Sequence, residues 1–288
     1  MRDIPTSPRI IEIRRNKRMR RLRLFILFFI LFISIVLALA YFSSAENLVI
    51  DKVVVNGTHI IDKEEIEKEV KKDISGKYIY LFSRNNSLIY PHKQIQNNLI
   101  LNFPRIESVS ISRDGLKTLQ IEIVERVGSF LYCGANIPSN KDEVGENCYF
   151  INNDGYIFDK APYFSGNVYF KYYMALPSGV KEPLAKQMVS VDRFHEIGRF
   201  IDGIASLGFN PIYLEVDRGG INYLYLNHNI NGTIPKIMFK NDVDLENILN
   251  NLSLAMKKKE FADEINSKYN RLLYIDLRFT NKVLYKFQ

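Results

Sequence analysis

The sequence predicts an α+β protein with a single N-terminal transmembrane helix, a small mixed domain and then a larger β-rich mixed domain. Three observations predict this architecture. Residues 24–42 contain no charged side chain. Residues 48–126 combine helical and alternating apolar patterns, and short runs rich in Tyr and Phe follow. The predicted segments are a basic tail (1–23), a membrane helix (24–45), a first domain (48–126) and a second domain (127–288).

The positive charge is confined to the N-terminal tail. Residues 1–23 carry nine Arg or Lys side chains and two acidic ones, which together account for the whole formal charge of +7. The remaining 30 basic and 30 acidic residues balance one another. A neutral body lacks the net charge that drives non-specific nucleic-acid binding, so we expect no nucleic-acid partner.

The uncharged run is long enough to cross a bilayer. Fifteen of the residues 24–42 are Leu, Ile, Val or Phe, and 19 helical residues span roughly 28 Å. A cleaved secretory signal is the alternative, because Ala38-Leu39-Ala40 has the form of a cleavage site after Ala40. The long basic tail and the interfacial aromatics Tyr41 and Phe42 favour an uncleaved anchor. The tail then lies in the cytoplasm and the chain beyond about residue 46 lies outside it.

The first domain is predicted to have the order strand, helix, helix, strand, strand. Asp62 is a helix N-cap candidate, and a narrow apolar stripe follows it as far as Gly76. Pro104 ends the second helix. The predicted elements are a strand at 49–55, helices at 62–76 and 93–101, and two strands on either side of the turn Asp114-Gly115.

The second domain is predicted to be strand-rich. A hairpin is expected around Asn152–Gly155. In the last segment Leu273, Ile275, Leu277 and Phe279 alternate with polar residues. Asp276 and Arg278 share the other face and could pair, and the alternative is a solvated surface pair that contributes little to stability. The other predicted elements are apolar runs at 130–132 and 149–151 that could pair, helices at 191–207 and 243–258, strands at 212–216 and 221–226, and a terminal strand at 283–287.

The two cysteines, Cys133 and Cys148, bracket a loop-like stretch in the exported part of the chain. A disulfide between them would close a loop of about 16 residues and stabilise the fold by roughly 3 kcal/mol in the chain-entropy model. Two free thiols are the alternative. Two cysteines and four scattered histidines lack zinc-like spacing, so no metal site is expected.

No catalytic constellation is found, so no enzyme, catalytic residue or cofactor is predicted. Ser178 and Lys181 have S-x-x-K spacing, but they follow Pro177 in a loop and lack the partner motifs of that enzyme class. The Asn and Asp residues at 152–154 are not a calcium loop, because Phe150 occupies the position of the first carboxylate ligand.

Four motifs stand in order along the chain: Val53-Val54-Val55-Asn56-Gly57, Phe103–Arg126, the hairpin at 149–158 and Ile275–Phe279. Together they resemble the bacterial FtsQ family, called DivIB in some lineages. The first motif resembles the opening strand and turn of the family's POTRA domain, and the second resembles its end. The hairpin at 149–158 resembles that of the family's β domain, and Ile275–Phe279 is the most specific match. The resemblance extends over residues 48–288.

This resemblance implies a non-enzymatic scaffold of cell division, anchored in the cell membrane at the septum. Its partners would be small bitopic coiled-coil proteins of the FtsB and FtsL type and the septal peptidoglycan synthase complex. The resemblance also implies that the β-rich domain ends in an exposed edge strand, beside which the partner adds a strand. By position, the implied contacts are Phe279, Asn281 and Phe287. Tyr285 is added from our reading of the edge strand alone. The alternatives are a membrane-anchored cell-wall enzyme and another envelope assembly factor that contains a POTRA domain.

Overall fold

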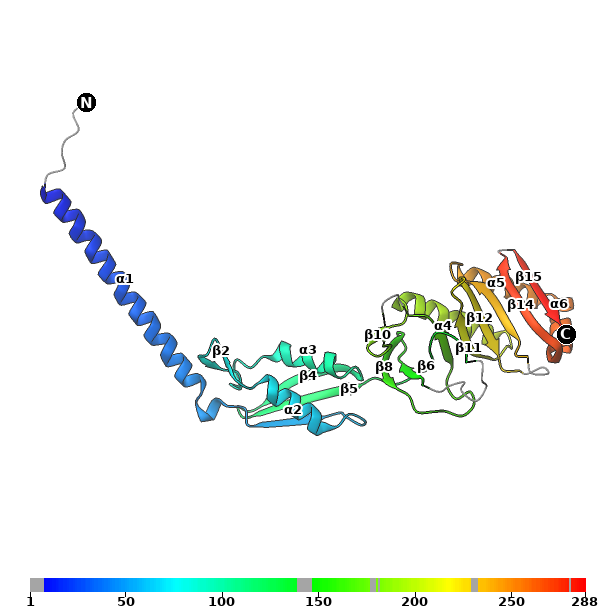
Figure 1. The fold of residues 1–288 in the computed structure, drawn as a ribbon, viewed down its shortest axis with the longest axis horizontal. Coiled ribbons are helices and arrows are strands. Elements are labelled where there is room, and N and C mark those ends of the chain that lie inside the picture. Colours follow the sequence, from blue (N-terminus) through cyan, green and yellow to red (C-terminus); the bar gives the residue numbers. More distant parts are fainter. Residues whose placement is uncertain (1–7, 139–146, 177–179, 181, 229–232, 280) are drawn as a thin grey trace, which may run out of the picture. The chain divides into compact units, whose positions relative to one another are not determined.

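The computed structural model describes residues 8–138, 147–176, 180, 182–228, 233–279 and 281–288. The chain divides into two compact units, with the boundary along the sequence between Glu125 and Arg126 (Figure 1). Their separate cores, described below, fit the α+β order that the sequence predicts.

The first unit begins with the apolar helix α1, Pro8–Ser43. The segment Arg15–Ser43 has a mean hydropathy of 3.0 over its most apolar window, and it is the one helix in the described residues with the length and composition of a membrane span. We predicted a helix start at residue 24. The helix in fact continues back through the basic tail to Pro8, since Arg and Lys are good helix formers. A 3₁₀ turn at Glu46–Leu48 follows.

A three-stranded sheet forms the centre of the first unit. The strands lie in the order β1 (Lys52–Asn56), β5 (Thr118–Glu125) and β4 (Ile106–Asp114), with β1 parallel and β4 antiparallel to β5. The apolar stripes of α2 (Lys63–Asp73) and α3 (His92–Asn102) pack in one core with these strands. The predicted helix cap is present, because Asp62 Oδ1 accepts the Glu64 N–H at 3.1 Å.

A small hairpin between the two helices was not predicted. It consists of β2 (Lys77–Tyr78) and β3 (Phe82–Ser83). Strands of two residues have too few positions to show an alternating pattern, so the sequence carries no signal for them.

The second unit is built on a ten-stranded sheet of order β10-β8-β7-β6-β9-β11-β12-β13-β14-β15. Parallel pairs join β6 with β9, β9 with β11, and β13 with β14, and the other neighbours are antiparallel. The strands are β6 (Phe130–Tyr132), β7 (Tyr149–Ile151), β8 (Tyr156–Lys160), β9 (Lys171–Met174), β10 (Lys186–Gln187), β11 (Pro211–Val216), β12 (Ile221–Leu226), β13 (Lys236–Lys240), β14 (Leu272–Phe279) and β15 (Lys282–Phe287).

Three helices supply much of the main core of this unit: α4 (Val191–Ser206), α5 (Leu245–Lys257) and α6 (Lys259–Ser267), after which a 3₁₀ turn at Tyr269–Arg271 leads into β14. Phe200 of α4 packs against Phe239 of β13, with ring centroids 4.8 Å apart. Gly203 lets α4 and α5 approach closely, because a Cβ there would lie 2.3 Å from Leu249 Cδ2. The sequence predicted α4 and α5 but not α6.

Strand β14 departs from the alternation that we predicted. Leu272 is fully buried in place of Leu273, because the pairing with β15 shifts register between Leu272 and Tyr274. The extra residue of such a bulge reverses which side chains face the core. Asp276 pairs with Arg278, and it is 4% exposed, so the pair is not the solvated surface pair that was the alternative.

Candidate partner-binding edge

The last strand, β15, lies at the edge of the ten-stranded sheet, with β14 on one side and no other strand of the described residues on the other. The backbone N–H of Gln288 donates to the Arg271 carbonyl at 2.8 Å, so the backbone groups of Gln288 face β14. Because these directions alternate along a strand, the backbone N–H and C=O groups of Val283, Tyr285 and Phe287 face outward. An outward row of this kind is a template for another strand.

The inner side chains of β15 pack against α6. The rings of Tyr285 and Phe261 lie edge to face with centroids 5.1 Å apart, and Tyr285 and Phe287 are in ring contact. The hydroxyl of Tyr285 donates to Glu264 Oε2 at 2.6 Å, and Lys268 Nζ donates to Glu264 Oε1 at 2.8 Å. The hydrogen bonds from Lys268 and Tyr285 lower the pKa of Glu264. Tyr285 and Phe287 are therefore half-buried, and their side chains help to hold β15 in place.

The outer face of β15 carries Lys282, Leu284 and Lys286, all of them exposed. Leu284 is 45% exposed between the two lysines. Alternate residues of a strand share a face, so the three side chains form one row of cation, apolar group and cation. We did not single out Lys282, Leu284 or Lys286 from the sequence, although the alternation of 282–287 shows which residues share a face.

Asn281 lies at a pocket of about 280 Å³ between the start of β15 and the two helices α5 and α6. Leu254 of α5, 59% exposed, and Phe261 of α6 supply its apolar lining, and Val283 closes it on the strand side. The i, i+4 apolar pair Phe261 and Ile265 is the sequence signal that could have revealed α6 and this pocket.

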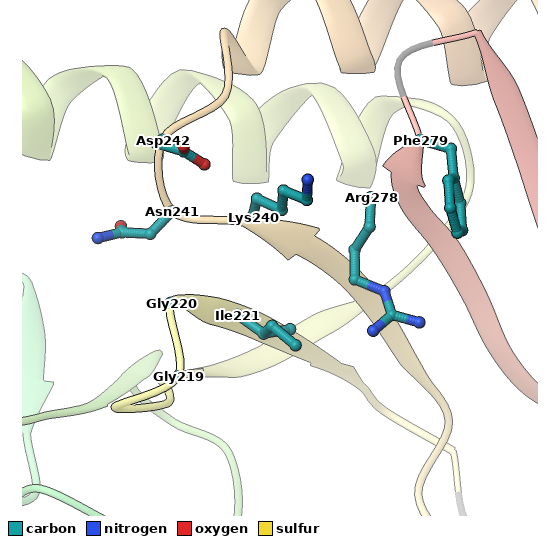
Figure 2. A pocket seen from close by; sticks show the side chains of 8 residues that line it. All are labelled: Gly219, Gly220, Ile221, Lys240, Asn241, Asp242, Arg278 and Phe279. Carbon is teal, nitrogen blue, oxygen red and sulfur yellow. The ribbon is translucent and has the colours of Figure 1, made fainter.

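Phe279 lies at a different place, a pocket of about 630 Å³ at one end of β12, β13 and β14. Figure 2 shows Lys240 and Arg278 extending from neighbouring strands at this pocket, with Phe279 at the end of β14. Phe279 is 50% exposed. The structure thus groups Asn281, Tyr285 and Phe287 along β15 and its helices, and it places Phe279 at the turn that leads into that strand.

In β14, the neighbour of the edge strand, Arg278 neutralises the buried carboxylate of Asp276. Arg278 Nε and Nη2 donate to the two carboxylate oxygens at 2.9 and 2.6 Å, and the Arg278 backbone N–H donates at 3.0 Å. Burial raises the pKa of Asp276, but the hydrogen bonds from Arg278 outweigh it and hold that pKa below its ordinary value. Asp276 pairs across the ladder with Leu284, and directly paired residues share a face, so this ion pair lies on the same face as the row of Lys282, Leu284 and Lys286.

The two cysteines lie in the same unit, in a smaller core cluster with Leu131 and Tyr173. In the structure Cys133 and Cys148 form a disulfide with Cα atoms 4.2 Å apart. The bond joins the ends of β6 and β7, which pair antiparallel as a hairpin. It therefore ties together the base of the loop that separates these two strands.

Reducing this disulfide is expected to destabilise the second unit by about 3 kcal/mol, because it frees a loop of about 16 residues in the unfolded chain. The bond is first checked by mass spectrometry under denaturing conditions, where reduction should add two hydrogens. Urea unfolding of the intact and reduced protein then measures the loss. The Cys133→Ser, Cys148→Ser double variant is the control, since a reductant should leave its midpoint unchanged. An unchanged mass on reduction would rule out the bridge.

In the described part of the chain, no group of three or more His, Cys, Asp or Glu side chains could hold a metal ion. Ser178 and Lys181, the residues with S-x-x-K spacing, lie outside the described residues.

Within the described residues, the fold and the edge define a class of protein: a chain with one apolar membrane-type helix, a small α+β unit and a β-rich unit whose last strand pairs with a strand on one side alone. Residues 48–126 match the model of the FtsQ-type POTRA domain. This match supports the assignment to the FtsQ/DivIB family of division-related proteins that the motifs predicted. The FtsQ-type POTRA family is a family of non-enzymatic scaffolds. A comparison with curated proteins finds no match.

Proposed function

We propose that the chain is a bitopic scaffold of the division machinery that sits at the septum and recruits FtsB- and FtsL-like coiled-coil partners. Helix α1 crosses the cytoplasmic membrane with the basic tail inside, because nine Arg and Lys residues precede the apolar run. Both folded units then lie outside the cytoplasm. Through its partners the scaffold helps to regulate septal peptidoglycan synthesis, as its family membership suggests.

The observation that carries this proposal is the free edge of β15. An extended partner segment adds as an eleventh strand and pairs with the outward backbone groups of Val283, Tyr285 and Phe287. Backbone pairing supplies affinity without depending on the identity of the side chains. This mode of binding also explains why two of the four predicted contact residues, Tyr285 and Phe287, are half-buried: their backbone groups make the contact while their side chains hold the strand.

Specificity comes from the row of Lys282, Leu284 and Lys286. A neighbouring strand places its own side chains directly beside these on the same face. Opposite charges are favourable at such cross-strand positions. The partner segment therefore carries an apolar side chain between two acidic ones at alternate positions. On its other face, an apolar side chain of the partner enters the pocket formed by Leu254, Phe261 and Val283.

Val283→Pro is expected to abolish partner capture, and Val283→Ala to preserve it. Both variants lose the valine side chain, but only proline removes the outward N–H of residue 283. Proline is tolerated on an edge strand where its missing N–H faces solvent. Each full-length variant is used as bait in an affinity pull-down from native membranes. Recovery of small single-pass coiled-coil proteins by the wild type and Val283→Ala alone supports the proposal.

Equal recovery by both variants would show that backbone pairing at β15 is not the mode of capture. Recovery of wall-hydrolysing enzymes or barrel-assembly components in place of coiled-coil proteins would favour one of the two alternative functions. The sequence of the captured partner gives an independent check, because a segment without the acidic, apolar, acidic pattern contradicts the role given to Lys282 and Lys286.

A further inference from the structure

The turn between β2 and β3 holds two large apolar residues in a backbone conformation that such residues avoid. Ile79 and Tyr80 have φ angles of 48° and 62°. The Leu81 N–H donates to the Tyr78 carbonyl at 2.9 Å, so Ile79 and Tyr80 are the two central residues of a hydrogen-bonded turn. Positive φ at both central positions is the pattern of a type I′ turn, for which Asn-Gly is the preferred pair. A β-branched isoleucine is strained there.

These residues are also almost completely exposed. Ile79 is 83% and Tyr80 is 94% exposed, so neither side chain contributes to the core of the first unit. Strain together with apolar exposure opposes both folding and solubility. Residues held in such strained backbone conformations cluster at functional sites. The Ile79-Tyr80 turn therefore points to a contact outside the folded unit.

The location of the turn identifies what it contacts. Its hairpin is joined to the last turn of α1: the Ser83 N–H donates to Ser43 Oγ at 3.2 Å, and Asn86 Nδ2 donates to the Ser43 carbonyl at 2.8 Å. Ser43 and Ala40 are buried there, at 7% and 8% exposed, whereas most of the apolar helix before them is exposed. The hairpin thus covers one side of the end of the apolar helix.

The end of α1 is also the level of the membrane surface. Residues 24–43 form about 30 Å of helix, which equals the thickness of the hydrocarbon core, so Ser43 lies at its boundary. Ala40 lies about 4.5 Å further in, at 1.5 Å per residue. A pocket of about 650 Å³ is lined by Ala40 and Tyr41 from the helix and by Lys77, Tyr80 and Leu81 from the hairpin, among others. Tyr80 therefore lies at the depth of the lipid interface.

We propose that the Ile79-Tyr80 turn inserts into the outer leaflet beside α1 and fixes the first unit against the membrane surface. Tyrosine suits this layer, because its ring is apolar and its hydroxyl is polar. Lys77, exposed at the same pocket, lies where it can meet lipid phosphates. The proposal rests on one part of the proposed function, namely that α1 spans the bilayer. It goes beyond that function by giving the POTRA domain a second membrane contact.

The test uses the absence of tryptophan from the sequence. A Tyr80→Trp substitution introduces a single tryptophan as the fluorescent reporter. The full-length variant is reconstituted in vesicles of phosphatidylcholine and phosphatidylglycerol. We expect blue-shifted emission and quenching by lipids brominated on their acyl chains. Ile79→Trp is a second reporter with the same expectation. The control is Ile60→Trp, which should show neither effect. Ile60 is 67% exposed in the same unit, but it follows the C-terminal end of β1, whereas α1 precedes the N-terminal end of that strand.

A third reporter separates the insertion of the Ile79-Tyr80 turn from the membrane span of α1. Phe28→Trp lies inside the apolar run, about 6 Å along the helix from Leu24, and should be quenched if α1 spans the bilayer. Quenching of Phe28→Trp without quenching of Tyr80→Trp and Ile79→Trp overturns the insertion of the turn and leaves the span intact. Absence of quenching at Phe28 overturns the span and the insertion together. Blue-shifted emission at Tyr80 that disappears at low protein density, without lipid quenching, identifies a neighbouring protein as the occupant and also overturns the proposal.

Discussion

Deletion of residues 279–288 is expected to abolish partner capture and to unfold the second unit, while the first unit stays folded. The deletion removes β15, whose inner side chains Val283, Tyr285 and Phe287 cover the main core, and it exposes Leu272 and Ile275 of β14. A fully buried side chain of this size contributes about 1.5–3 kcal/mol. The total loss, on the order of 5 kcal/mol, matches the whole stability of many domains.

The first unit should survive because its core is separate. Its fully buried side chains come from β1, α2, α3, β4 and β5, and none comes from the second unit. Hydrogen exchange followed by mass spectrometry measures both units in one experiment, with pull-down of the partner as the functional readout. Slow exchange should persist in β4 and β5 and disappear from β11–β14. Partner recovery at the wild-type level would exclude β15 as the docking strand, and lost protection in β4 and β5 would exclude independent cores.

The same separation explains why the first unit was the easier part to predict from sequence. Its helices have narrow apolar stripes, such as Ile66 and Val70, and its strands alternate cleanly on either side of Asp114-Gly115. Each of these signals is local, so it needs no knowledge of the partner element. The β2–β3 hairpin escaped prediction because its turn uses Ile79 and Tyr80, where the turn type favours Asn and Gly.

The second unit could be predicted only in outline. The hairpin at 149–160 and the two longer helices follow from local patterns, but the order of the ten strands depends on parallel pairs such as β13 with β14, which a helical segment separates. The bulge at Leu272–Tyr274 has no signal in the sequence, and it reverses the expected orientation of Leu272 and Leu273. An alternating apolar pattern therefore does not predict which side chains face the core where a bulge shifts the pairing of two strands.

The candidate site shows the same division between local and non-local information. That the last strand is an edge was inferred from a family resemblance, and the sheet order places it there. Which backbone groups face outward follows from the contact between Gln288 and Arg271, which lie together at one end of the β14–β15 pair. The burial of Asp276 likewise depends on its neighbours, because Met238 and Leu284 lie beside it on the adjacent strands.

This burial makes Arg278→Met the second large effect that we expect. The substitution leaves the carboxylate of Asp276 buried, with only the residue-278 backbone N–H to stabilise its charge. Removing one partner of a buried ion pair costs about 3–5 kcal/mol, and the partial exposure of the guanidinium reduces the expected loss at neutral pH to about 2 kcal/mol. This loss is measured from the urea midpoint of the second unit, with unfolding monitored by the loss of hydrogen-exchange protection in β14.

The pH dependence identifies the carboxylate as the cause. In the wild type the folded-state pKa of Asp276 is lowered from 3.8, so its contribution is present above about pH 4 and is lost as the pH falls through the folded value. Without Arg278, burial raises that pKa, and ionisation then opposes folding. The stability difference between wild type and Arg278→Met should therefore be small near pH 3 and grow as the pH rises through 4 and 5.

In the Asp276→Asn background, Arg278→Met should have an effect that does not change over this range, since no carboxylate remains to titrate. A difference between wild type and Arg278→Met that is constant from pH 3 to pH 7 would mean that Arg278 stabilises β14 by packing alone, without acting through the charge of Asp276.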